Sequence, residues 1–426
     1  MNSAAMTGVK KIKMHILFIA HNFQPEPNVF FGLPLAKALK QQGHTVEILT
    51  GFPNYPAGKI YDGYKIKLRQ KEMMDGIPVI RVPLYPSHNR SSIKRIISYS
   101  SLSMAQATLG ITSVQKADVA YVCQGPATIG LPSVIAKWLR KIPFVYHIQD
   151  LWPDSLSATG MFDSKSGIKV LHKWCKFVYS QADQIITISP GVKELLCERG
   201  VPESKISIVY NWCDEQKLLP AGDVSELSSE YADIFKDKFN IVYAGNIGKA
   251  QALESVINAA EIIRKKNSNI QFVIIGNGVD KNALQQKIIH EKIKNVVFLP
   301  QQPSSEINKF LNQADVLLVH LKETELFKIT IPSKIQAYLA TGKPIMVGVN
   351  GDAGDLVLKA EAGFSCQPEN AESIAKTALE FYSLQASELK SIGTRGREFY
   401  KNNLSFEIAL KKMNDIFEKV VKQKQK

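Results

Sequence analysis

The residues best suited to chemistry in this sequence are glycines and lysines placed where strands pass into helices. The segment YAGNIGKA (243–250) follows an apolar run and leads into a helical pattern, with Gly245, Gly248 and Lys249 in the turn. Glycines let a backbone approach an anion, and the N–H groups of a following helix attract it. The turn therefore predicts a phosphate site, although glycines of this kind also occur in purely structural turns.

A second lysine lies at the start of a predicted helix in IPSKIQAYLATGKPIM (331–346). Pro332 suits the first helical turn, which places Ser333 and Lys334 beside exposed backbone N–H groups. Gly342 then ends the helix. We expect an anion site here, with Lys334 as the counter-charge. The turn IIGNG (274–278) is compatible both with a close approach to a flat ligand and with a tight turn.

The segment HIQDLWPDS (147–155) offers a carboxylate directly after a buried strand. Asp150 stands beside Trp152 and Pro153, so we expect it to be desolvated and suited to act as a general base. The alternative is an aspartate that caps the following turn.

Several chemistries are excluded by missing patterns. The sequence contains no H-x-x-x-H, H-E-x-x-H, G-x-S-x-G or Walker motif, and its first loop is not G-x-G-x-x-G. No D-x-D pattern follows a strand, so we expect no dedicated metal site. The 5 cysteines are scattered and include no C-x-x-C pair, which argues against a disulfide framework or zinc ribbon and for a reducing cytoplasm.

The elements that must position these residues alternate between short apolar runs and helical patterns. In the first half the predicted strands are 15–20, 45–50, 77–82, 118–123, 143–148, 184–189 and 206–210, with the first helix over 29–42. In the second half they are 239–245, 270–276, 295–300, 315–321 and 344–349. Such alternation predicts parallel sheets covered by helices on both faces.

The chain is too long for one hydrophobic core, at 426 residues. We predict two doubly wound α/β domains, at 14–212 and 239–386, joined by a polar linker over 213–238. Helices over 387–426 are expected to pack back on the first domain. Ligands of open α/β sheets bind at the carboxyl ends of the strands, so we expect the chemistry between the domains.

The charge is concentrated in the first half. Residues 1–212 hold 25 Lys+Arg against 13 Asp+Glu, a net of +12, and the rest hold 28 against 26, a net of +2. This imbalance favours an anionic partner for the first domain, or a generally basic surface. No helix-turn-helix, zinc-finger or RNP-type pattern accompanies it, so nucleic acid is not the expected partner.

The uncharged stretch 96–115 has about the length of a membrane-spanning helix but contains many serines and threonines. It follows the basic residues Arg90, Lys94 and Arg95. This pattern favours a helix lying on an anionic membrane surface, and an ordinary surface helix is the alternative. The first 13 residues contain no apolar core of the kind found in signal peptides. We therefore expect a cytoplasmic protein, peripheral on the inner face of the membrane.

Taken together, these segments resemble the family 4 glycosyltransferases of the GT-B fold over nearly the whole chain. The resemblance is carried by HILFIAHNFQPEP (15–27), HIQDLWPDS (147–155), YAGNIGKAQALE (243–254), IIGNG (274–278), VVFLPQQP (296–303) and IPSKIQAYLATGKPIM (331–346). The wording is most similar to bacterial enzymes that build capsule and O-antigen on a polyprenyl-diphosphate carrier, some with N-acetylated deoxyamino sugars such as L-fucosamine. The resemblance implies a retaining transferase that uses a nucleotide sugar, UDP-linked, without a metal cofactor.

The resemblance also implies roles for particular residues. It assigns Lys249, Lys334 and the acceptor-side base Asp150 to catalysis. It places the following residues at the donor: Phe31, Gly32, Gly245, Asn246, Gly248, Gly276, Gly278, Leu299, Ser333 and Gln336. Positive charge at the leaving diphosphate would stabilise the departing anion. No carboxylate nucleophile is evident, which favours a front-face transfer over a covalent intermediate.

The sequence departs from the wider family at two places. Phe31-Gly32 stands where most members have two glycines, and Ile329 and Ala337 stand where most have a pair of glutamates, the second of which holds the donor ribose. Two other hypotheses therefore stay open. One is a nucleotide-sugar 2-epimerase of the same fold, and the other is a non-catalytic scaffold.

Overall fold

The computed structural model describes residues 12–27, 31–87, 92–158, 164–218, 227–266 and 269–425. The chain forms two compact units. Unit 1 comprises Met1–Thr187, Leu196–Val209 and Leu410–Lys426, and unit 2 comprises Ile188–Leu195 and Tyr210–Ala409.

Unit 1 is built on an eight-stranded sheet with the order β3-β4-β2-β1-β5-β6-β7-β8. Its strands are β1 (His15–Ala20), β2 (Thr45–Gly51), β3 (Gln70–Met74), β4 (Ile77–Val82), β5 (Val119–Gln124), β6 (Phe144–Ile148), β7 (Gln184–Thr187) and β8 (Ile206–Ile208). All neighbours pair in parallel except β3, which runs antiparallel to β4 at the edge. The central strands are buried almost throughout, as expected for a sheet covered on both faces.

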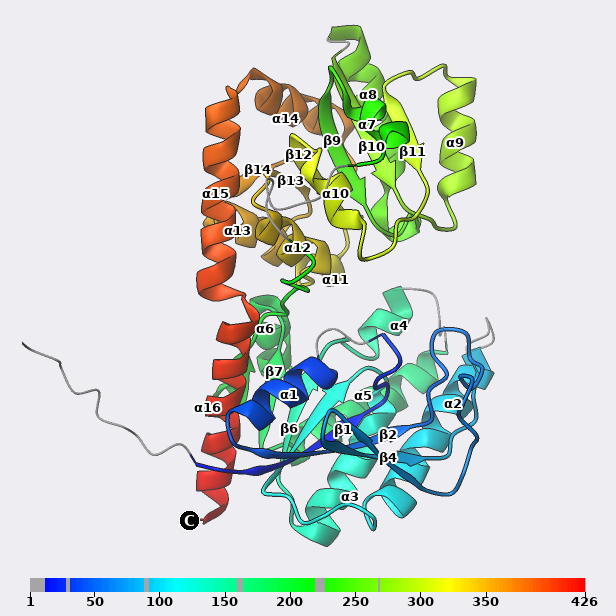
Figure 1. Ribbon diagram of the computed structural model, residues 1–426, viewed down its shortest axis with the longest axis vertical. Coiled ribbons are helices and arrows are strands. Elements are labelled where there is room, and N and C mark those ends of the chain that lie inside the picture. Colours follow the sequence, from blue (N-terminus) through cyan, green and yellow to red (C-terminus); the bar gives the residue numbers. More distant parts are fainter. Residues whose placement is uncertain are drawn as a thin grey trace, which may run out of the picture. The chain divides into compact units, whose positions relative to one another are not determined.

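Helices connect these strands and cover the sheet (Figure 1). They are α1 (Leu33–Gln41), α2 (Ser92–Ala105), η1 (Gln106–Gly110), η2 (Ala127–Ile129), α3 (Gly130–Arg140), α4 (Asp154–Ala158), α5 (Lys165–Gln181), α6 (Pro190–Glu198), which unit 2 shares, η3 (Glu203–Lys205) and most of α16 (Phe406–Gln425). The first helix begins at Leu33, later than predicted, because Gly32 forms its N-cap.

Unit 2 contains a six-stranded parallel sheet with the order β11-β10-β9-β12-β13-β14. Its elements are α7 (Ser229–Phe235), β9 (Phe239–Ala244), η4 (Lys249–Gln251), α8 (Leu253–Lys266), β10 (Ile270–Ile275), α9 (Lys281–His290), β11 (Val296–Leu299), α10 (Ile307–Asn312), β12 (Val316–His320), α11 (Glu325–Lys328), α12 (Ser333–Thr341), β13 (Ile345–Gly348), α13 (Asp352–Lys359), β14 (Gly363–Ser365), α14 (Ala371–Ser383) and α15 (Ala386–Asn403). The strand order reverses between β9 and β12, which is the position where doubly wound sheets bind ligands.

The two doubly wound sheets confirm the predicted α/β architecture, but the predicted boundaries differ from the observed ones. The polar linker contains α7, whose Phe235 is buried in the core of unit 2. The segment Ile188–Leu195 groups with unit 2 rather than with unit 1.

The C-terminal helices also differ from the prediction, because only the second of them packs on unit 1. In α15, a Cβ added to Gly393 would lie 1.9 Å from the carbonyl oxygen of Gly342, so glycine lets this helix pack tightly on the end of α12 in unit 2. In Figure 1, α15 runs beside β14 and α13, while α9 lies at the opposite edge of the same sheet. In α16, Phe417 is fully buried, with its ring 5.7 Å from that of Tyr121 in unit 1.

The stretch 96–115 packs one face into unit 1 and leaves the other exposed. Its second half forms η1, where Gln106 is buried and donates to the carbonyl oxygen of Ala20 at 2.9 Å. A Cβ on Gly110 would lie 2.6 Å from the Leu49 side chain, so this part packs closely against β2. Exposed apolar side chains remain on α2, with Ile96 at 45% and Ile97 at 47% exposure. No helix in the part of the chain that the structure describes is long and apolar enough to cross a membrane.

Candidate functional site

The most distinctive charged group of unit 2 is the ammonium of Lys334, in the first turn of α12. Its Nζ donates to the hydroxyl of Tyr243 at 2.8 Å and lies 4.3 Å from the centroid of that ring. Burial lowers the pKa of Lys334 to about 8. None of the described carboxylates forms an ion pair with it. A half-buried cation without a carboxylate partner favours a bound anion, because an anion would compensate for the lost hydration.

Gly245 provides the space that this lysine occupies. The residue directly follows β9 with φ +143°, and a Cβ there would lie 2.7 Å from Lys334 Cε and 3.0 Å from its Nζ. A side chain at position 245 would therefore displace the ammonium. The helix that carries Lys334 begins at the exposed Ser333. Pro332 is the N-cap of this helix, so it lies just before the first turn in which the sequence analysis placed it. The charge and the first N–H groups of a nine-residue helix thus lie near the carboxyl end of β9.

The loop after β9 is held by its own side chains. The Gln251 Oε1 accepts hydrogen bonds from the Gly248 N–H at 3.1 Å and from the Asn246 side chain at 3.0 Å. The Tyr243 hydroxyl donates to the carbonyl oxygen of Asn246 at 2.5 Å. These bonds fix the loop shape but use the Gly248 N–H, which the sequence had suggested for anion binding.

Lys249 is less constrained than Lys334. It is exposed and begins the short helix η4, and the longer helix α8 starts only at Leu253. Lys249 lies on the predicted loop, without the burial that marks Lys334.

The glycines of the turn after β10 have a packing explanation. A Cβ on Gly276 would lie 1.9 Å from the carbonyl oxygen of Gly245, and one on Gly278 would lie 2.1 Å from that of Ile247. The two turns thus pack backbone against backbone. The Leu299 carbonyl accepts the Gly276 N–H at 3.3 Å, and the Leu299 side chain is buried. Packing of the two turns explains the glycines, and the predicted contact of these three residues with the donor stays a prediction.

The side chain of Gln336 is held by its own helix. Its side chain is buried, and its amide nitrogen is assigned toward the carbonyl oxygens of Pro332 at 3.0 Å and Ser333 at 3.2 Å. The side chain folds back on its own helix because buried amides need internal partners. The predicted contact of Gln336 with the donor stays a prediction.

His320, at the end of β12, was not singled out in the sequence and has a structural role. The Glu369 N–H donates to its Nε2 at 3.2 Å, so the ring proton lies on Nδ1, which donates to the Gln251 carbonyl oxygen at 2.8 Å. Burial lowers the pKa of His320, which keeps the ring neutral. The histidine joins β12 to the loop after β9.

Unit 1 has a polar hollow of about 330 Å³ at the carboxyl ends of its strands, which we call the Asp150 hollow. It is lined by His21, Asn22, Asn54, Tyr55, Ser87, Ser98, Tyr99, Gly125, Pro126, Asp150, Trp152, Ser155 and Leu156. These residues come mainly from α2 and from the turns after β1, β2, β5 and β6. The hollow thus occupies the ligand-binding edge of a doubly wound sheet.

Asp150 is fixed through its backbone while its carboxylate stays available. The Asp150 carbonyl oxygen accepts hydrogen bonds from the Gln124 side chain at 2.8 Å and the Trp152 N–H at 2.9 Å. Asp150 is exposed as a residue, and partial desolvation of its carboxyl in the hollow raises the pKa above its ordinary value. No group in the described part of the chain donates a hydrogen bond to this carboxylate, which argues against the turn-capping alternative.

His21 is a second titratable group in the Asp150 hollow that the sequence analysis did not single out. It directly follows β1, and its ring meets that of Tyr99 edge to face with 5.1 Å between the centroids. Burial lowers the pKa of His21 to about 4, so the imidazole is neutral near pH 7. A neutral imidazole can accept a proton. Its position after the first strand was the available sequence signal.

A buried carboxylate holds two walls of the Asp150 hollow together. Glu26 accepts the N–H groups of Asn54 at 2.6 Å and Tyr55 at 2.7 Å, and that of Phe23 at 3.2 Å. These bonds join the turn after β1 to the turn after β2. In the segment between β1 and α1, the Leu33 N–H donates to the Gln24 Oε1 at 2.8 Å.

The other described residues that were predicted for unit 1 lie at the start of α1 and on α2. Gly32 is buried at the N-cap of α1 with φ −88°, a conformation open to any residue, and Phe31 is half-buried beside it. Lys94 and Arg95 lie on α2, and Arg90 falls outside the described residues.

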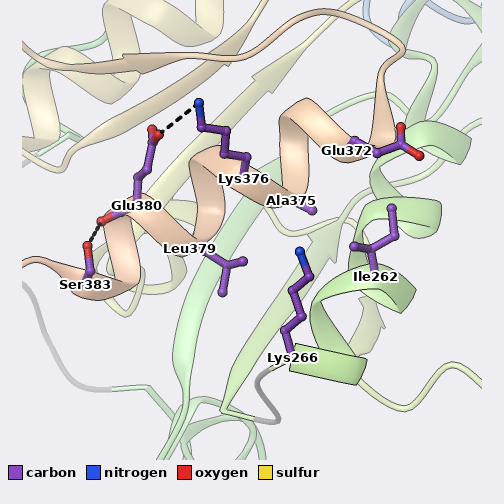
Figure 2. Close-up of a pocket in the computed structure, with 8 residues that line it drawn as sticks. All are labelled: Ile262, Lys266, Glu372, Ala375, Lys376, Leu379, Glu380 and Ser383. Atoms are coloured by element: carbon purple, nitrogen blue, oxygen red, sulfur yellow. Dashed lines mark hydrogen bonds and ion pairs between the residues drawn. The ribbon is translucent and has the colours of Figure 1, made fainter.

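A further hollow on unit 2, shown in Figure 2, does not bring reactive groups together. It lies between α8 and α14, away from the strand ends, and its lining charges include the surface pair Lys376–Glu380, 3.8 Å apart. Among the described residues no group of three or more His, Cys, Asp or Glu could hold a metal ion.

Comparison with solved structures defines the class of protein. The chain superimposes on the Anabaena protein HepE, solved with UDP and glucose, with a TM-score of 0.65 and 15% identity over 95% of this chain and 99% of that one. At this identity the likeness shows the fold, which is that of the GT-B glycosyltransferases.

Comparison of sequences defines the family. Residues 33–212 match the Glycosyl transferase 4-like domain, and residues 225–399 match Glycosyl transferases group 1. The chain belongs to the family 4 glycosyltransferases and is a glycosyltransferase. It is 27% identical over 427 aligned residues to WcaI of Escherichia coli (strain K12), named for colanic acid biosynthesis, covering 95% of this chain and 100% of WcaI. It is 25% identical to the glycosyltransferase WbjE of Pseudomonas aeruginosa, covering 76% of this chain and 81% of WbjE.

Proposed function

We propose that the enzyme transfers a sugar from a nucleotide diphosphate to a lipid-linked saccharide during assembly of a bacterial surface polysaccharide, with retention at the anomeric carbon. The observation that carries the proposal is the half-buried, carboxylate-free ammonium of Lys334 beside Gly245. A diphosphate is the anion that this arrangement suits, because the charge and the helix N–H groups act on the same leaving group.

The donor site lies on unit 2. Lys334 and the N-terminus of α12, which includes Ser333, bind the diphosphate near the sugar, and Lys249 supplies a second charge from the loop after β9. Asn246, Gly245 and Gly248 shape this loop. The turn of Gly276 and Gly278 with the Leu299 backbone borders the nucleobase. The complex of HepE with UDP and glucose supports UDP as the nucleotide.

The acceptor site is the Asp150 hollow on unit 1. Asp150 accepts the proton of the attacking hydroxyl, and the neutral His21 in the same hollow positions that hydroxyl or shares the proton. The aromatic rings of Tyr99 and Trp152 suit the apolar faces of a saccharide. The family resemblance assigns Phe31 and Gly32, at the start of α1, to the donor sugar.

The proposed reaction needs no metal cofactor, because protein groups supply the positive charge at the leaving diphosphate. The lysines and the helix N-terminus neutralise the leaving group, so no step requires a metal ion. Front-face transfer explains retention without an enzymic carboxylate nucleophile.

The biological setting is proposed from the relatives and from the surface of unit 1. WcaI is named for colanic acid biosynthesis, which supports a role in the assembly of a surface polysaccharide. Lys94 and Arg95 precede the exposed Ile96 and Ile97 on α2, a combination that favours reversible contact with an anionic membrane. We place the enzyme at the inner face of the cytoplasmic membrane.

The test is a panel of nucleotide sugars, each incubated with the enzyme in the presence and absence of lipid-linked acceptors. Release of nucleotide only when acceptor is present is the expected result. Conversion of a nucleotide sugar without acceptor would indicate the 2-epimerase instead. Binding of nucleotide with neither outcome across the panel would favour the scaffold.

A further inference from the structure

An apolar groove lies on unit 1 beside the Asp150 hollow. It has a volume of about 670 Å³, within the usual range for small-molecule sites. Its walls come from α2 and α5, with contributions from η2, α3 and the turn after β6. The side chains that matter here are Tyr99, Met104, Trp152, Val170, Leu171 and Trp174.

Several apolar side chains that line the groove are unusually exposed to solvent. Met104 is 57% exposed and Val170 is 67% exposed, and they lie on different helices that face the same groove. Scattered apolar residues on a surface need no explanation, but a contiguous exposed patch marks a binding site. Trp174 is fixed in the wall, because its Nε1 donates to the carbonyl oxygen of Ala127 at 3.0 Å.

The groove is continuous with the Asp150 hollow. Tyr99, Trp152 and Leu156 line both of them. The rings of Tyr99 and Trp152 lie 6.2 Å apart, edge to face. A molecule that occupied both cavities would have an apolar part in the groove and a polar part beside the Asp150 carboxyl.

The charge at the groove fits an anionic link between these parts. Arg95 is the one charged residue among those that line it within the described chain, and no carboxylate lines it there. Lys94, the preceding residue of α2, is exposed. A phosphate near this helix would therefore meet positive charge.

We infer that the groove binds the hydrocarbon chain of a polyprenyl-phosphate-linked acceptor, with the phosphate near Arg95 and the saccharide in the Asp150 hollow. This inference rests on the proposed function, since it names how the acceptor of that reaction is held. A single polyprenyl chain would occupy the apolar groove, and the saccharide attached to it would reach the polar hollow that is continuous with the groove. The groove then selects acceptors by their lipid and presents the sugar hydroxyl to Asp150.

The experiment measures binding of farnesyl diphosphate to the purified full-length protein by tryptophan fluorescence. Trp152 and Trp174 both line the groove and report its occupation. The variants are Met104→Asp and Val170→Asp. The matched control is Leu139→Asp on α3, a 72% exposed residue of the same unit that does not line the groove. All three positions are exposed, so the folds are expected to persist, and circular dichroism checks this.

We expect each groove variant to weaken farnesyl diphosphate binding at least tenfold, with Leu139→Asp within twofold of wild type. Inorganic diphosphate should neither change the fluorescence nor compete at the same concentration. Wild-type binding by both groove variants, or an equal loss in Leu139→Asp, would overturn the inference.

Two further measurements separate this inference from the proposed function. Lys334→Met should bind farnesyl diphosphate like wild type, which excludes the donor site as its location, and a parallel loss in that variant would overturn the groove assignment. UDP binding is measured separately. Groove binding without UDP binding would refute the proposed donor but not the groove, and UDP binding without groove binding would refute only the groove.

Discussion

The Lys334 ammonium lies 2.8 Å from the Tyr243 hydroxyl, at the point where β9 gives way to the loop that begins at Gly245. The contact joins the first turn of α12 to the first strand of the sheet in unit 2. It holds a cation in place before any ligand arrives, and such preorganisation is what makes a fixed charge effective against a leaving anion.

The first prediction compares the two lysines assigned to the donor. Lys334→Met keeps the length and apolar contacts but removes the charge, and we expect kcat/KM to fall by about 100-fold or more. Lys249→Met should cost less, about 10-fold, because this lysine is exposed and its charge is screened by solvent. The exposed Lys359→Met on α13 is the control and should be unchanged. Equal activity in all three variants would reject the donor site.

The second prediction concerns pH. Burial lowers the pKa of Lys334 to about 8, so the group is a cation below that pH and loses its charge above it. UDP affinity should therefore fall as the pH rises through 8, by about 30-fold between pH 7 and 9.5 if binding requires the cation. Calorimetric titration in that range measures it. An arginine at 334 stays charged, so Lys334→Arg should show a flat profile even if its affinity is lower.

The residues around Lys334 show which features of the site could be predicted from the sequence and which could not. The pattern of Pro332, Ser333 and Lys334 predicted the helix start and its charge, because local signals determine a helix N-terminus. It could not predict Tyr243 as the lysine's partner, since that contact joins residues 91 positions apart. Likewise, Gly276 suggested a ligand, but its closeness to Gly245 depends on the pairing of β9 with β10.

The fold, too, has elements that the sequence predicted and elements that it did not. The long apolar runs identified both sheets, whereas β3 and β14 were missed, because the exposed edge strand β3 lacks an apolar run and β14 has only three residues. The role of α15 was mistaken because Gly393 and Gly396 look like helix-weakening residues until their partners at Gly342 and Ala362 are known.

The third prediction tests the general base. Asp150→Asn should lower kcat by about 100-fold or more and leave the KM for the nucleotide sugar unchanged, because Asp150 is assigned to the acceptor and belongs to unit 1, whereas the donor-binding groups belong to unit 2. Partial desolvation raises the pKa of Asp150, so the carboxylate forms at a higher pH than in an ordinary aspartate. The acid limb of the wild-type kcat profile should be shifted upward accordingly and should be absent from the variant. A variant that is less stable but fully active would instead support a capping role.

The fourth prediction is structural. Gly276→Ala would bring its Cβ to 1.9 Å from the Gly245 carbonyl oxygen at φ +154°, so the two turns would have to separate. We expect a loss of about 2 kcal/mol or more in stability, seen as a fall of several degrees in the melting temperature of unit 2. Val279→Ala, at an 80% exposed position of the same loop, should melt like wild type. Unchanged melting of Gly276→Ala would show that the turns are not packed as described.

The last prediction concerns the membrane. Residues 1–212 carry a net charge of +12 of the total +14, and α2 presents Lys94 and Arg95 next to the exposed Ile96 and Ile97. Anionic lipid attracts such residues with about 1 kcal/mol each, so the Lys94→Glu/Arg95→Glu variant should bind anionic vesicles at least 30-fold more weakly. The control is Lys65→Glu/Lys67→Glu, which makes the same change of charge at exposed positions of unit 1 outside α2.

Co-sedimentation with anionic and with zwitterionic vesicles, at low and at high salt, measures the effect. Wild type and control should bind anionic vesicles at low salt and be released by high salt, because the attraction between exposed charges is screened. Binding that ignored lipid charge and salt would indicate insertion of the apolar face instead. Equal losses in both charge variants would mean that the overall charge of unit 1, rather than α2, makes the contact. Absence of binding by wild type would leave α2 as an ordinary surface helix, whose exposed side chains then serve only the groove they share with α5.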